Sequence, residues 1–147
     1  MRNRSRILKG IALALGMSLV VGTVSASHSW NNYHWARNTS SFNLQVIDST
    51  TPNWDVELGH AVNEWSQSNS LNLNVTAADD SSKTRRRCPA VSGKIRVCNM
   101  AYGSNGWLGL ASINLDSQGH ISQGTAKMND SYFMDANERR HVMCQEV

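Results

Sequence analysis

The chain has 147 residues, with 14 Lys and Arg against 11 Asp and Glu and a formal net charge of +3. Four of the basic residues (Arg2, Arg4, Arg6 and Lys9) lie in the first nine positions, which leaves 10 basic and 11 acidic side chains in residues 27–147, a net charge of about −1. The positive charge therefore belongs to the N-terminus and gives no reason to expect a nucleic acid or an anionic membrane as partner.

The N-terminal segment has the layout of an export signal. Its basic residues precede an apolar run over Ile11–Val21, which suits the core of a signal peptide and is short for a membrane span. Residues 24–26, Val-Ser-Ala, place small side chains before a cleavage point. We therefore expect residues 1–26 to be a signal peptide, with an uncleaved anchor as the alternative. Residues 27–147 are then one secreted domain without a membrane span.

Hydrophobic periodicity predicts one strand, one helix, four further strands and a final helix. Apolar and polar residues alternate most clearly in LNLNVTA, and the first helix follows a turn at Pro52. The expected elements are strand 42–48, helix 54–67, and strands 71–77, 93–99, 110–115 and 120–128, followed by a helix from residue 136 or 137. Strands mixed with helices in this order indicate an α+β class with a twisted sheet backed by helices.

Residues 78–92 are predicted to form a charged, polar loop. They contain Arg85, Arg86 and Arg87, the one basic cluster after the signal segment. We interpret this cluster as a solvated loop, with a site of proteolytic nicking as the alternative.

Three cysteines are an odd number for an exported chain. Cys88 and Cys98 are close in sequence and flank a loop with proline and glycine, so we expect them to form a disulfide. Cys144 is left over, and either it is free or its partner lies outside this chain.

The last residues, HVMCQEV, place Glu146 in an apolar helical run. In the HExxH helix of a zinc protease, two histidines four residues apart bind one metal ion, and the glutamate after the first histidine is the general base. Gln145 stands where that first histidine would be. Taken alone, the Gln-Glu pair favours the interpretation of an ordinary polar pair on a helix surface.

Four stretches carry a more specific likeness: YHWAR at 33–37, VCNMAYGSNGWLGLASI at 97–113, KMNDSYF at 127–133 and HVMCQEV at 141–147. In their amino-acid sequences and their order along the chain, these stretches resemble the secreted bacterial matrixin-like metalloproteases of the metzincin clan, over nearly all of residues 27–147. The resemblance implies a metzincin-like upper subdomain, in which a twisted mixed sheet of about five strands has one backing helix and an active-site helix.

The resemblance also implies a site. Glu146 matches the general base, and Gln145 occupies the first-ligand position, where an amide oxygen is a poor zinc ligand compared with imidazole. In the family the helix continues with Gly-His and then a further Gly and His, so the second and third zinc ligands fall beyond Val147. The chain is then expected to be the N-terminal part of a zinc-dependent endopeptidase, ending inside the zinc-binding helix and inactive alone. Cys144 would pair with a later cysteine.

The resemblance implies that the substrate is a protein or a peptide. In metzincins the substrate pairs with an edge strand above the active-site helix, and residues 110–115 occupy that place in the element order. A plain sheet strand has the same pattern. The competing hypotheses are a secreted non-catalytic binding domain, with an aromatic face formed by the five tryptophans, and a degenerate pseudoenzyme.

Overall fold

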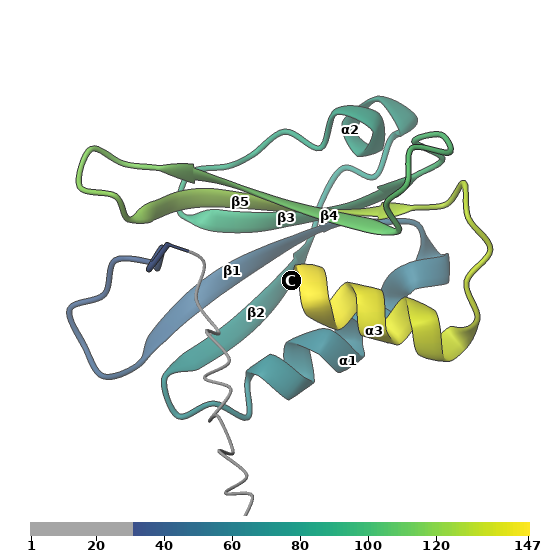
Figure 1. The fold of residues 1–147 in the computed structure, drawn as a ribbon. Helices are drawn as coiled ribbons and strands as arrows, with labels where there is room; N and C mark the ends of the chain where they lie inside the picture. The colour runs from purple at the N-terminus through teal and green to yellow at the C-terminus, as the bar shows by residue number, and fades with distance from the viewer. Residues whose placement is uncertain (1–30) are drawn as a thin grey trace, which may run out of the picture.

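Five strands form one mixed sheet in the computed structural model, which describes residues 31–147 (Figure 1). They are β1 (Phe42–Ser49), β2 (Leu71–Ala77), β3 (Lys94–Met100), β4 (Gly109–Leu115) and β5 (Ile121–Asn129), arranged in the order β2-β1-β3-β5-β4. All neighbours are parallel except β4, which runs antiparallel to β5. The predicted α+β class and a mixed sheet of five strands are confirmed, and β2 and β4 are its edges.

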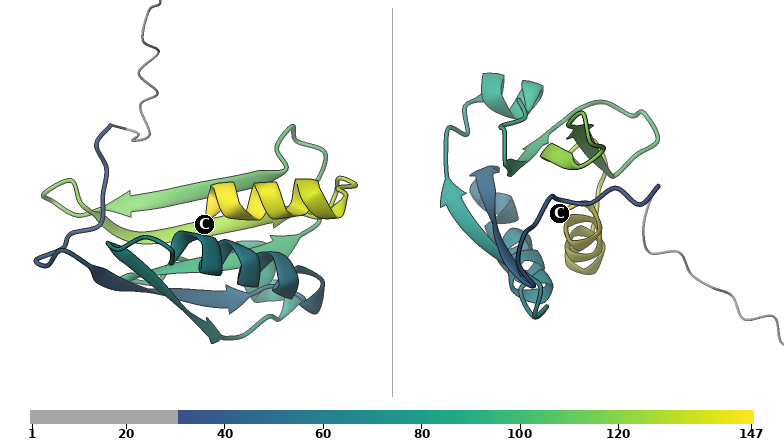
Figure 2. Two further views of the ribbon diagram at one scale, coloured as in Figure 1. Left: turned by 90° about the horizontal axis from the view of Figure 1, so that it is seen from below. Right: turned by 90° about the vertical axis from the view of Figure 1, so that its left-hand side faces the viewer.

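Two helices cover one face of the sheet and a short helix covers the other. α1 (Asp55–Trp65) and α3 (Ala136–Glu146) lie side by side below the sheet as drawn in Figure 1, and α2 (Ser82–Arg87) lies above it. Figure 2 shows the same pairing of α1 with α3 from a second direction. A 3₁₀ turn at Pro52–Trp54 leads into α1.

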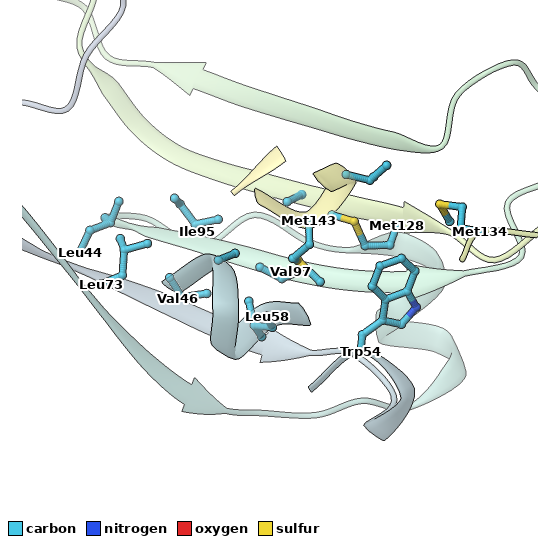
Figure 3. Close-up of a cluster of buried hydrophobic side chains, with 13 residues drawn as sticks. Leu44, Val46, Trp54, Leu58, Leu73, Ile95, Val97, Met128, Met134 and Met143 are labelled. Atoms are coloured by element: carbon cyan, nitrogen blue, oxygen red, sulfur yellow. The ribbon is translucent and has the colours of Figure 1, made fainter. Parts of the chain in front are cut away.

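The core lies between the sheet and the two helices α1 and α3 (Figure 3). The alternation in β1 explains its composition, because Leu44 and Val46 are buried while Asn43 and Gln45 are exposed on the opposite face. The core residues are Leu44, Val46, Trp54, Leu58, Ala61, Leu73, Ile95, Val97, Ala126, Met128, Met134, Val142 and Met143.

The helix α2 corrects the prediction of a loop over residues 78–92, and it adds a helix to the expected pair. The hydroxyl of Ser81 caps α2 by accepting from the backbone N–H of Thr84, and Cys88, with φ 45°, ends the helix in a left-handed conformation. No residue of α2 itself is buried. Hydrophobic periodicity therefore cannot predict this helix, and only its capping residues indicate it.

The predicted disulfide between Cys88 and Cys98 is present, with the two Cα atoms 5.9 Å apart. It ties the end of α2 to the middle of β3. Cys144 is a free, half-buried thiol. The predicted signal peptide, residues 1–26, lies outside the described residues, in which no helix is long and apolar enough to cross a membrane.

Replacing both bridged cysteines, as Cys88→Ala with Cys98→Ala, should lower the free energy of unfolding by about 2–3 kcal/mol, because the bridge closes a short loop in the unfolded chain. Urea denaturation followed by tryptophan fluorescence measures this change. Cys144→Ala is the control and should have a smaller effect. Equal stability of the double variant and the parent would contradict the prediction.

Candidate active site

The helix α3 starts at a defined point. The carboxylate of Asp135 accepts hydrogen bonds from the backbone N–H groups of Asn137 (2.8 Å) and Glu138 (2.9 Å), and the side chain of Glu138 bonds back to the N–H of Asp135 (3.0 Å). This capping box satisfies N–H groups that have no partner within the helix. The position of every later residue of α3 is set by this start.

Ion pairs then fix α3 against α1. Arg139 pairs with Glu57, with Nε and Oε1 2.9 Å apart, and its guanidinium lies 4.0 Å from the ring centroid of Trp54. One residue further, Arg140 pairs with Glu64. The pair formed by Arg139 is largely shielded from water, so it is expected to hold the helix more firmly than the exposed pair at Arg140.

Helical spacing places Glu146 on the buried side of α3. Val142 and Met143 are buried in the core, and Glu146 follows Val142 by four residues, so it lies on the same side of the helix. The carboxylate is half-buried, whereas Gln145 and His141 are exposed. The two residues of the Gln-Glu pair therefore lie in different environments.

The strand β4 lies directly against this side of α3 because it begins with a glycine. A Cβ atom on Gly109 would lie 2.6 Å from Cγ of Glu146 and 2.7 Å from Cγ1 of Val142. Both distances are shorter than non-bonded carbon atoms tolerate. The absence of a side chain at this position allows the strand and the glutamate to approach each other.

The edge of β4 that faces Glu146 has backbone groups that do not bond to β5. The N–H of Asn129 donates to the carbonyl of Leu108 at 2.8 Å, and in the antiparallel register Gly109 lies opposite Met128. Alternate residues of an antiparallel strand bond to the partner strand, so Gly109, Ala111 and Ile113 direct their backbone groups away from β5. The N–H of Ala111 donates to the carboxylate of Glu146. The site is thus a carboxylate at the open edge of a strand.

This environment changes the acidity of Glu146. Burial raises the pKa of the Glu146 carboxyl above its ordinary value, and the hydrogen bond from Ala111 opposes this shift only in part. A carboxylate with a raised pKa is a better proton acceptor near neutral pH.

The described residues do not fit a zinc ion by themselves. No group of three or more His, Cys, Asp or Glu side chains in residues 31–147 is arranged to hold a metal. Gln145, in the predicted first-ligand position, is exposed and offers one neutral oxygen. His34 and His120 do meet, with ring centroids 5.1 Å apart, and Asp116 lies 3.4 Å from Nδ1 of His120. Sequence spacing gave no sign of this cluster, which joins residues far apart in the chain.

Cys144 lies where α3 packs against α1. Its thiol donates to the carboxylate of Glu64 at 3.5 Å, and its carbonyl accepts from the indole N–H of Trp65 at 3.0 Å. Burial is the main cause that raises the pKa of the Cys144 thiol. A raised pKa disfavours the thiolate, so Cys144 is not activated as a nucleophile.

The tryptophans do not form one aromatic face. Trp54 is a core residue, 1% exposed, and its indole N–H donates to Asp130. Trp35 and Trp65, by contrast, line a cavity of about 470 Å³ together with Tyr33, Phe42 and Leu71. The predicted aromatic surface is therefore reduced to this cavity among the described residues, and Trp30 lies outside them.

Comparison with known proteins places the chain in no family. No protein-family model, no curated protein and no solved structure matches it. Any assignment of function therefore depends on the residues and the geometry described above.

Gly109→Ala should lower the free energy of unfolding by about 1–3 kcal/mol, because the new methyl group overlaps Glu146 and Val142. Thermal and urea denaturation measure the change. Gly59→Ala is the matched control: an added Cβ there meets no atom within 4 Å, and alanine favours the helix α1, so it should be neutral or stabilising. Equal effects of the two substitutions would contradict the close approach of β4 to α3.

Glu146→Gln should stabilise the folded protein at neutral pH and have a smaller effect in acid. A carboxyl whose pKa is raised by folding binds its proton more tightly in the folded state, so its contribution to stability falls as the pH rises from its ordinary pKa through the raised value. Glutamine is neutral throughout. The expected gain is at most about 1 kcal/mol, because water partly screens a half-buried group. Urea denaturation at pH 3 and pH 7 tests this, and a larger gain at pH 3 would contradict it.

Proposed function

We propose that this chain is the part of a secreted zinc-dependent endopeptidase that carries its general base, Glu146, and its peptide-binding strand, β4. The observation that carries the proposal is the position of the Glu146 carboxylate at the open edge of β4, where it accepts a hydrogen bond from Ala111. An edge strand lying on the helix that bears the general base is also the arrangement that the metzincin resemblance implies.

The open edge of β4 supports a peptide as substrate. Gly109 and Ile113 offer backbone N–H and C=O groups, and Ala111 offers its C=O group because its N–H already donates to Glu146. An extended peptide can pair with these groups as an additional strand. Pairing of this kind recognises the backbone of the substrate, so it suits an endopeptidase that accepts many sequences. It also brings a peptide carbonyl alongside the half-buried carboxylate.

The role we assign to Glu146 is proton transfer. As water adds to the peptide carbonyl, the carboxylate accepts a proton from the water, and it returns that proton to the amine nitrogen when the C–N bond breaks. The raised pKa of Glu146 favours both transfers near neutral pH.

The zinc ion needs ligands that the described residues do not supply. A catalytic zinc has three protein ligands, and residues 31–147 offer the exposed amide of Gln145 as the one matched position. We therefore assign no catalytic step to zinc here. Following the resemblance, we place the remaining ligands in polypeptide that follows Val147, and the 147-residue chain alone is expected to be inactive.

The test is to express the reading frame through and beyond the codon for Val147 and to assay hydrolysis of a fluorescent casein. We expect hydrolysis that a zinc chelator abolishes. Glu146→Gln should lower kcat by at least about 100-fold, because glutamine cannot accept the proton. Asp80→Asn is the control, since it removes an exposed carboxylate in the segment between β2 and α2. Full activity of Glu146→Gln, or no hydrolysis by any product of the frame, would contradict the proposal.

A second candidate function is a non-catalytic binding domain, and one observation favours it. The cavity between Trp35 and Trp65 has a mostly apolar lining to which Arg37 and His34 add polar groups. This composition is typical of sites that bind small ligands. This function requires no proton transfer. Under it, Glu146→Gln would leave every activity unchanged, whereas Trp35→Ala would remove ligand binding.

A further inference from the structure

Basic side chains gather on the face of the sheet opposite α1 and α3. The side chain of Cys98 faces α2, because it is bonded to Cys88, and strand alternation places Lys94 and Arg96 on the same face. Lys127 lies beside Cys98 in the register. We call this surface the basic face, and its cations are Lys83, Arg85, Arg86, Arg87, Lys94, Arg96 and Lys127.

Two contacts confirm that β5 and α2 share this surface. The ammonium of Lys127 lies 5.5 Å from the ring centroid of Tyr102, and the hydroxyl of Tyr102 donates to the carbonyl of Arg85 at 2.6 Å. The strand cations and the helix cations are therefore neighbours, although they are up to 44 positions apart in the sequence, from Lys83 to Lys127.

None of these seven cations forms an ion pair with a carboxylate of the described chain. Arg85 and Arg96 donate to backbone carbonyls, and Arg96 also donates to the hydroxyl of Ser49. The nearby acids are Asp79, whose carboxylate is engaged by Ser81 and Thr84, Asp80, and Asp130, which lies close enough to act on Tyr102. Seven cations against three acids near this surface leave three cations and eight acids in the rest of residues 31–147. A nearly neutral domain thus has one strongly positive face.

A row of amide side chains continues the basic face toward β2. Asn74 of β2, Gln45 of β1 and Lys94 of β3 are successive partners in the register. With Asn43 and Gly93, these amides line a hollow of about 610 Å³. The amide of Asn74 has no hydrogen-bond partner among the described residues, so it is available to a ligand.

We infer that the basic face binds an anionic polysaccharide, one whose sugar units carry carboxylate or sulfate groups. Amide side chains both donate to and accept from sugar hydroxyls, and lysine and arginine pair with the acid groups. The hollow is polar, whereas a membrane-binding surface places apolar side chains among its cations. Single-stranded nucleic acid favours exposed aromatic rings, and here Tyr102 packs against Trp107 and under Lys127. This inference does not rest on the proposed peptidase.

The first test uses heparin and alginate oligosaccharides as probes, with neutral dextran as the reference, and measures Kd by calorimetry on the full chain. We expect binding to both acidic probes and none to dextran. Arg86→Ser with Arg87→Ser should raise Kd by about tenfold or more and make binding less sensitive to salt. Arg86→Ser alone should raise Kd more than Arg140→Ser alone, which removes one exposed cation from α3. Equal effects of these two single variants would overturn the inference.

The second test separates a polysaccharide from other polyanions. Gln45→Ala with Asn74→Ala should weaken binding of the acidic oligosaccharides and leave binding of a DNA oligonucleotide unchanged. Asn63→Ala, an exposed amide on α1, is the control. Tighter binding of the oligonucleotide, or of phosphatidylserine vesicles, than of either acidic oligosaccharide would overturn the inference, as would an unchanged oligosaccharide Kd in the amide variant. Circular dichroism establishes that each variant is folded.

Discussion

The contact between Gly109 and the last turn of α3 is the constraint on which the candidate active site depends. A strand can approach a helix this closely only where it has no side chain, and the missing Cβ is what leaves room for Val142 and Glu146. The capping box at Asp135 and the ion pair between Arg139 and Glu57 set the position of α3 along the sheet. Moving the helix by one turn would take the carboxylate away from Ala111.

The same sheet separates two kinds of surface. Toward α1 and α3 it buries the apolar core and presents a carboxylate at the edge of β4. Toward α2 it presents cations without ion pairs and a row of amides, and the disulfide between Cys88 and Cys98 ties the end of α2 to this face. The proposed chemistry and the proposed polysaccharide site therefore lie on opposite faces, and each can be removed by substitution without touching the other.

Much of the fold could be predicted from local pattern. Alternation in FNLQVID and LNLNVTA correctly predicted strands, although the apolar face is well buried only in β1 and Leu73 is the one buried residue of β2. The ten-residue spacing of Cys88 and Cys98 suited a disulfide. The helix α2 was not predicted because none of its residues is buried. The gathering of Lys94, Lys127 and Arg86 could not be predicted either, since it depends on the strand order β1-β3-β5, which a single sequence does not reveal.

The candidate site was predicted only in part. Glu146 was identified through a family resemblance, but its contact with Ala111 depends on β4 being an edge strand that lies on α3, which follows from long-range pairing. Gln145 was placed at a ligand position, and the structure leaves it exposed. The cluster of His34, Asp116 and His120 was missed for the same reason, because the bridge between Trp35 and Ile121 brings the N-terminal segment to β5.

The most direct test of this account is an NMR titration that follows the amide proton of Ala111 as the pH is changed. If Glu146 accepts the hydrogen bond from this amide while half-buried, the Ala111 shift should change with a pKa above the ordinary value of a glutamate, and the change should disappear in Glu146→Gln. An Ala111 amide that does not respond to pH, or that responds equally in Glu146→Gln, would show that the carboxylate is not at the edge of β4.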